Sequence, residues 1–207
     1  MKPQRIEITS IGVDLDNTLI DYSLAYKAIA AKRNVQVDIP DREHIRNALR
    51  RGSEDEEWQA FQSLLYTDGL NYAQLADGAE EFLTVCQMLD VRVFIVSHKT
   101  ARGPRRFGSR DLRQPAVSWL ESHGVEVMGV QKSDVFFEDS QEAKVDKIRN
   151  LTPDVFIDDL ESVLSHPLWP RSTLPIRYAH GPWSYMSGRW QAGFPAISDW
   201  VHRRGDA

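Results

Sequence analysis

The chain has 207 residues, of which 42% are hydrophobic and 27% are charged, which is typical of a folded globular protein and excludes disordered and fibrous chains. Thirty Asp and Glu residues outnumber 25 Lys and Arg residues, and the resulting net charge of -5 disfavours a surface built to bind long nucleic acids. The single cysteine, Cys86, excludes an intramolecular disulfide and a multi-cysteine zinc site, so we expect a cytoplasmic protein. Because no run of about 18 apolar residues occurs, we expect no membrane span.

Apolar, β-branched runs that stop at a polar residue predict the buried strands of a parallel sheet. These runs cover residues 5–15, 91–97, 133–138 and 153–159, with a weaker run at 174–180. Helical patterns lie between them at 78–90, 114–123 and 140–150, with Asp77 and Ser140 as candidate N-caps of the first and last. This alternation predicts right-handed βαβ crossovers and an α/β fold, a three-layer α/β/α sandwich around a parallel Rossmann-like sheet.

The segment 22–76 interrupts the alternation, because it contains successive helical patterns and no convincing strand. We predict that it is a small helical cap insert, and that residues 1–21 and 77–207 form the α/β core domain. Its size suits a lid over the carboxyl edge of the sheet, and a simple structural extension is the alternative. The Arg-rich loop 101–113 could contact an acidic or phosphorylated substrate, or could be a solvated loop.

Polar residues end the predicted strands, and in a parallel sheet these ends converge at one edge, where ligands bind. They are Asp14, Asp16 and Thr18 after the first strand, Ser97 at the end of the second, and Asp158 and Asp159 at the end of the fourth. Crowded carboxylates repel one another unless a cation neutralises them. Mg²⁺ takes such oxygen ligands and is the usual ion where phosphate completes its shell, so we predict a magnesium site.

The spacing of Asp14 and Asp16 allows both carboxylates to reach one site as the chain turns after the strand. One can then attack a phosphorus atom while the other transfers protons, because environment sets the role of each carboxylate. Lys144, near the start of the helix before the fourth strand, could balance their charge. Ser97 and the amides after it could bind phosphate oxygens.

These segments resemble the four motifs of the haloacid dehalogenase-like (HAD) hydrolases. VDLDNTL (13–19) is similar to motif I, and VFIVSHKT (93–100), with Ser97, is similar to motif II. EAKVDKI (142–148), with Lys144, resembles motif III, and VFIDDLESVL (155–164) resembles motif IV. The resemblance covers roughly residues 5–165 and leaves the helical insert unmatched in detail.

The resemblance implies a Mg²⁺-dependent phosphatase that hydrolyses a small phosphorylated metabolite through an aspartyl-phosphate. It makes Asp14 the nucleophile and Asp16 the general acid and then the base. It places the Mg²⁺ on Asp14, on Asp16 through its backbone carbonyl, and on Asp158, with Asp159 binding directly or through water.

The same resemblance assigns Ser97 and Lys144 to the phosphoryl oxygens, with Lys144 also offsetting the charge of Asp14. Thr18 supports the loop around Asp16, and we group it with the phosphate-binding residues. His98 joins this group by adjacency to Ser97, although a surface or second-layer histidine is the more frequent case for such a residue.

Several alternatives remain open in the sequence. Lys147, one helical turn after Lys144, and Lys132 are other candidates for the motif III lysine. Asp16 argues for phosphate-ester hydrolysis, since dehalogenases lack an acid at that position and transport ATPases of the family carry Thr there. The segments 157–159 and 177–184 are similar to the deoxyribonucleotidase-like branch, so a nucleotidase, a nucleic-acid end phosphatase and a non-catalytic binding protein of HAD fold are alternative functions.

Overall fold

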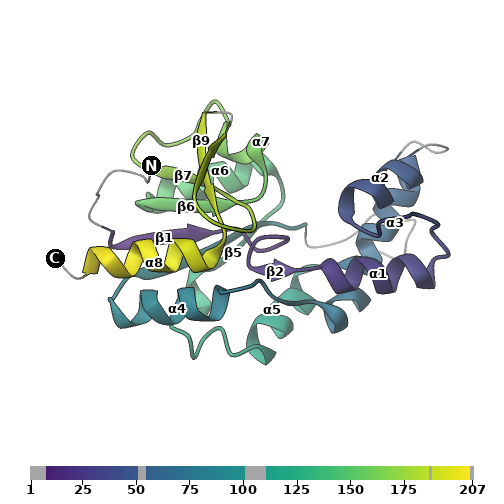
Figure 1. Ribbon diagram of the computed structural model, residues 1–207, viewed down its shortest axis with the longest axis horizontal. Helices are drawn as coiled ribbons and strands as arrows, with labels where there is room; N and C mark the ends of the chain where they lie inside the picture. The colour runs from purple at the N-terminus through teal and green to yellow at the C-terminus, as the bar shows by residue number, and fades with distance from the viewer. Residues whose placement is uncertain (1–7, 51–54, 101–110, 187, 206–207) are drawn as a thin grey trace. The chain divides into compact units, whose positions relative to one another are not determined.

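The computed structural model describes residues 8–50, 55–100, 111–186 and 188–205 of the chain (Figure 1). The chain divides into two compact units. Unit 1 comprises Met1–Ile20, Leu75–Lys99 and Glu121–Ala207, and unit 2 comprises Asp21–Gln74 and Thr100–Leu120. Of the Arg-rich loop 101–113, the part from 101 to 110 lies outside the described residues, as do residues 5–7 of the first predicted strand. Within the described ranges, none of the helices combines the length and the apolar character needed to cross a membrane.

Unit 1 is built on a seven-stranded sheet with the strand order β5-β4-β1-β6-β7-β9-β8. All neighbouring strands are parallel except β8, which pairs antiparallel with β9 at one edge. The strands are β1 (Ser10–Val13), β4 (Arg92–His98), β5 (Val135–Glu138), β6 (Val155–Asp158), β7 (Leu174–Tyr178), β8 (Ser184–Met186) and β9 (Arg189–Ala192). This confirms the predicted parallel Rossmann-like sheet and adds β8 and β9, which the sequence pattern does not predict.

Helices cover both faces of this sheet (Figure 1). On one face α4 (Ala79–Met88) packs against α8 (Phe194–Gly205), with the rings of Phe82 and Phe194 5.0 Å apart. On the other face lie α6 (Gln141–Leu151) and α7 (Glu161–Leu164). The predicted three-layer α/β/α sandwich is therefore confirmed.

The two predicted helix caps have different outcomes. Ser140 caps α6 as predicted, because its hydroxyl accepts a hydrogen bond of 3.0 Å from the backbone N–H of Ala143. The Asp77 prediction is wrong, because the residue that precedes α4 is Gly78, in the left-handed conformation at φ 73°. Glycine adopts that conformation without steric cost, and a Cβ there would also lie 2.6 Å from the Pro195 ring.

Unit 2 is mainly helical, with α1 (Ser23–Lys32), α2 (Arg42–Arg50), α3 (Glu56–Leu65) and the short 3₁₀ helix η1 (Asp68–Tyr72). Tyr26 and Phe61 stack at 6.3 Å in its core. The two-residue strands β2 (Ile20–Asp21) and β3 (Gln74–Leu75) pair where the chain enters and leaves its first segment. The sequence pattern predicts an insert over 22–76 alone, whereas unit 2 also takes in 100–120, and α5 (Arg113–Ser122) runs from that segment into unit 1.

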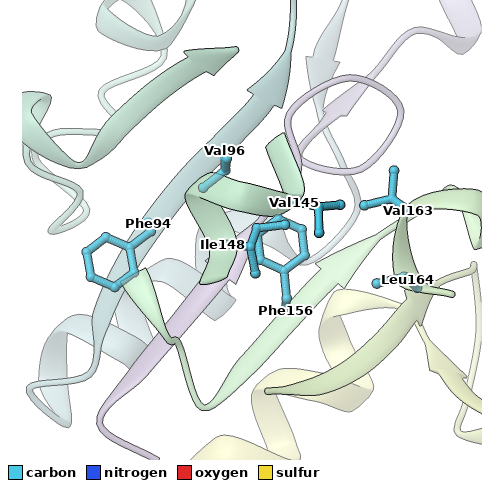
Figure 2. Close-up of a cluster of buried hydrophobic side chains, with 7 residues drawn as sticks. All are labelled: Phe94, Val96, Val145, Ile148, Phe156, Val163 and Leu164. Carbon is cyan, nitrogen blue, oxygen red and sulfur yellow. The ribbon is translucent and has the colours of Figure 1, made fainter. Parts of the chain in front are cut away.

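Seven buried side chains between the sheet and the helices α6 and α7 form one core cluster (Figure 2). They are Phe94 and Val96 of β4, Phe156 of β6, Val145 and Ile148 of α6, and Val163 and Leu164 of α7. Gly12 of β1 lies in the strand between β4 and β6, and the Phe156 ring occupies the space that a side chain at position 12 would fill. This packing joins α6, which contains Lys144, to the part of the sheet that contains β1, and Asp14 directly follows β1.

Gly12→Ala should destabilise the protein by about 1–3 kcal/mol, the usual cost of overpacking a core. A Cβ at position 12 would lie 2.3 Å from the nearest atom of the buried Phe156 ring, so the ring would have to shift. Urea denaturation followed by circular dichroism measures the effect. In the double variant with Phe156→Leu, the loss should be smaller than the sum of the two single losses. Additive losses would contradict the proposed clash.

Candidate active site

The predicted site residues gather at the carboxyl edge of the sheet, where β4, β1 and β6 lie side by side. Asp14 directly follows β1, and its backbone N–H donates to the Ile157 carbonyl at 2.8 Å, which extends the pairing with β6 by one residue. Ser97 is the sixth residue of β4 and Asp158 the last of β6. All three side chains are buried. Parallel pairing alone therefore brings together residues from three distant segments of the chain.

A tight loop after β1 turns the chain between Asp14 and Asp16 and back toward the sheet. The Ile20 N–H donates to the Leu15 carbonyl at 2.8 Å, which closes the loop. Asn17 has a φ of 63°, a left-handed conformation that Asn tolerates better than most residues other than glycine. The sequence DNT after Leu15 thus suits a loop that presents two carboxylates close to one strand end.

Three carboxylates form a group that could hold a metal ion. Asp14, Asp158 and Asp159 each offer one oxygen atom, and these oxygens all lie within 4.8 Å of one another. Asp14 and Asp158 are buried and Asp159 is partly exposed. The Asp16 carboxylate is not a member of this group, and metal binding through the Asp16 backbone carbonyl stays a prediction.

Lys144 of α6 joins these acids, as predicted for the motif III lysine. Its ammonium donates to Asp14 and to Asp158, in the latter case at 2.6 Å, and its side chain is buried. Lys147 instead lies over the Phe136 ring, with its Nζ 3.6 Å from Glu138. Lys132 pairs with Glu121 at 2.9 Å. The structure therefore places Lys144, and neither alternative, beside the predicted nucleophile.

A lysine that the sequence analysis did not select completes the cluster. Lys99 lies two residues after Ser97, is buried, and has its Nζ 2.9 Å from Asp16 Oδ1. The Ser97 hydroxyl donates to Asp16 Oδ2 at 3.4 Å. The two-residue spacing from Ser97 was the available signal, since alternate residues of an extended chain face the same way.

The electrostatics of the site combine burial with an excess of negative charge. Burial is the largest cause that raises the pKa of Asp14 well above its ordinary value, and the charges of Asp158, Asp159 and Asp16 add to it, while Lys144 opposes it. Burial alone would lower the pKa of Lys144, but Asp14 and Asp158 outweigh it and raise that pKa. Both shifts indicate a cluster that would bind additional positive charge.

Thr18 and His98 occupy different positions around this cluster. The buried Thr18 hydroxyl accepts a hydrogen bond of 3.1 Å from the Asp159 backbone N–H, so Thr18 ties the loop after β1 to the end of β6. This contact fits the expected support of the loop. His98, at the end of β4, is exposed as a whole residue, but partial desolvation of its ring and the charge of Lys144 lower its pKa below the ordinary 6.5. Phosphate binding by Thr18 and His98 stays a prediction.

No family model matches the chain, and no curated protein gives a significant sequence match. Solved structures do match. A HAD-superfamily hydrolase from Ehrlichia chaffeensis has a TM-score of 0.56 at 16% identity, covering 97% of this chain and 99% of its own. A HAD hydrolase of family IA, variant 3, from Entamoeba histolytica has a TM-score of 0.59 at 13% identity, covering 97% and 100%. A HAD family hydrolase from Deinococcus radiodurans R1 has a TM-score of 0.61 at 12% identity, covering 96% of each chain. These matches span nearly the whole chain, and the protein has the fold of the haloacid dehalogenase-like hydrolases.

Proposed function

We propose that the protein is a Mg²⁺-dependent phosphatase that hydrolyses a small phosphorylated metabolite through an aspartyl-phosphate intermediate. One observation carries the proposal. Asp14 lies against Lys144 and within a metal-binding group with Asp158 and Asp159, while the carboxylate of Asp16, two residues away, is held apart from that group. The HAD family hydrolase from Deinococcus radiodurans, which shares the fold, was solved with bound phosphate and sodium, which supports a phosphate site in this fold.

The residues fit a divalent cation. Carboxylate oxygens are the ligands that Mg²⁺ prefers, and Asp14, Asp158 and Asp159 supply three of them. The four aspartates of the cluster and the two lysines, Lys99 and Lys144, carry a formal charge of -2 when all are ionised. A bound Mg²⁺ would bring that charge to zero, so an incoming phosphoryl group would not meet a site of net negative charge.

In the first step an oxygen of the Asp14 carboxylate attacks the phosphorus of the substrate. The new bond joins Asp14 to phosphorus, and the bond between phosphorus and the leaving-group oxygen breaks. Asp16 gives its proton to that oxygen, so the leaving group departs as a neutral alcohol. Lys144 stabilises the charge on the transferred phosphoryl group. In this proposal the Ser97 hydroxyl, which donates to Asp16 at 3.4 Å, donates to a phosphoryl oxygen instead when substrate is bound.

In the second step water attacks the phosphorus of the aspartyl-phosphate. Asp16, now ionised, accepts the proton of that water, and the bond between phosphorus and the Asp14 oxygen breaks. Inorganic phosphate leaves, Asp14 is again a carboxylate, and Asp16 has regained its proton. The two aspartates therefore divide nucleophilic and proton-transfer work between them.

Phosphate release from a panel of monoesters tests this function. The panel contains p-nitrophenyl phosphate, sugar phosphates, nucleoside monophosphates and a 5′-phosphorylated oligonucleotide, so it also separates the nucleotidase and nucleic-acid end phosphatase alternatives. We expect hydrolysis of small monoesters in Mg²⁺, complete loss in excess EDTA, and recovery when Mg²⁺ is added back. Turnover that survives EDTA, or a panel without any turnover, would contradict the proposal.

A further inference from the structure

We infer that Lys99 is a positioning residue, which holds the carboxyl group of Asp16 away from the acidic metal-binding group. At that position Asp16 gives its proton to the leaving group in the first step and, ionised and paired with Lys99, accepts the proton of water in the second. The inference rests on the proposed function, since it gives Asp16 its proton-transfer role. Lys99 would act through Asp16 and not through the phosphoryl group.

The burial of the ion pair is the first observation. The Lys99 side chain is 1% exposed, that of Asp16 is 14% exposed, and their charged atoms are 2.9 Å apart. Burying an ammonium costs several kcal/mol unless it is paired and hydrogen-bonded. A lysine with this exposure therefore stays in place because of the carboxylate that it contacts, and it limits where that carboxylate can go.

The sheet fixes the position of Lys99 itself. His98 of β4 pairs with Glu138 of β5, and the Lys99 backbone N–H donates to the Glu138 carbonyl at 3.0 Å, so the ladder continues one residue past the end of β4. Ser97 and Lys99 are two residues apart on this extended segment and reach the two oxygens of the same carboxylate. Asp16 is thus held from one strand by two donors of fixed spacing.

Two buried lysines contact different aspartates of the cluster. Lys144 contacts Asp14 and Asp158, and Lys99 contacts Asp16. Without Lys99, the Asp16 carboxylate would lose the ammonium that it contacts, although it lies only two residues from Asp14 of the metal-binding group. A carboxylate that turned toward that group would no longer be available to protonate a leaving group.

Leaving-group dependence tests this role. Lys99→Met is compared with wild type on p-nitrophenyl phosphate, whose leaving group needs no proton, and on n-propyl phosphate, whose alkoxide must be protonated. In Mg²⁺ we expect kcat/KM of the variant to fall on the order of 10²-fold on n-propyl phosphate. On the nitrophenyl ester we expect it to fall by no more than about tenfold. Lys132→Met, which removes an exposed ammonium paired with Glu121, is the control and should match wild type on both.

A double-mutant cycle separates positioning from other roles. In the background of Asp16→Asn, Lys99→Met should add less than about a threefold loss, because the residue through which it acts is already disabled. Melting temperatures check that each variant folds, and Lys99→Gln, which keeps a donor without the charge, replaces the Met variant if that variant is unfolded. An equal loss on both esters, or additive losses in the cycle, would overturn the inference while leaving the phosphatase proposal intact. A wild-type protein that hydrolyses neither ester would overturn both.

Discussion

Asp14→Asn should abolish phosphate release, with a loss in kcat on the order of 10⁴-fold or more, as found when an enzyme nucleophile is removed. The amide cannot attack phosphorus, and no other carboxylate of the cluster is placed in the same way against Lys144 at the end of β1. The change removes one negative charge from a buried and crowded group, so the fold should be retained. Initial rates on the best substrate of the panel, in saturating Mg²⁺, measure the effect.

The matched control for this substitution is Asp154→Asn. Asp154 lies before β6, at the opposite end of that strand from the site, where its carboxylate accepts hydrogen bonds from Thr9 and Ser10. It should keep the wild-type rate and lose only stability. A burst of leaving group in rapid mixing would report the aspartyl-phosphate directly and should be absent in Asp14→Asn. If Asp14→Asn keeps substantial turnover, the covalent mechanism is wrong.

Lys144→Met should destabilise the folded protein by about 3–5 kcal/mol at neutral pH without Mg²⁺, the usual cost of breaking a buried ion pair. The ammonium contacts both Asp14 and Asp158, and its loss leaves two buried carboxylates without that cation. Because burial raises the pKa of Asp14, that group binds a proton more readily in the folded state, so the difference from wild type should shrink as the pH falls. Urea denaturation at several pH values measures it.

Lys147→Met is the control for this prediction, since it removes a lysine from the same helix. Lys147 is 32% exposed and its Nζ is 3.6 Å from Glu138, so we expect a change within about 0.5 kcal/mol. Mg²⁺ should raise the melting temperature of Lys144→Met more than that of wild type, because the ion would replace part of the lost positive charge. Equal destabilisation by the two lysine variants would contradict the assignment of Lys144 to the site.

The buried strands of the sheet could be predicted from sequence because they appear as clear apolar runs. Strands such as β4 and β6 are continuous apolar runs, which only a sheet covered on both faces can bury. The edge strand β8 and its neighbour β9 were not predicted because they are three and four residues long and are partly exposed, so neither alternation nor a continuous apolar run marks them. Gly78 was missed as the residue before α4 because side-chain capping by Asp77 was the stronger sequence signal.

Residues of the site could be predicted where their spacing along the chain or their position at a strand end brings them together. Asp14, Ser97, Asp158 and Lys144 meet because β4, β1 and β6 are neighbours and α6 packs over them. Lys99 was not predicted, because a lysine in a polar segment is usually solvated and this outweighs the signal of its two-residue spacing from Ser97. Its burial depends on the carboxylate of Asp16, which comes from a loop more than eighty residues earlier.

The first segment of unit 2, Asp21–Gln74, starts and ends close together, and this affects how the chain folds and how it tolerates insertions and deletions. Ser10 of β1 pairs with Arg92 of β4, but the Leu19 carbonyl already accepts a hydrogen bond of 3.0 Å from the Ala76 N–H. Once the hydrogen bond between Leu19 and Ala76 forms, only a short connection remains between β1 and β4. The entropic cost of closing the loop from Leu19 to Ala76 grows only with the logarithm of the loop length. Insertions or deletions within this segment should therefore change the folding rate little and leave the register of the central strands intact.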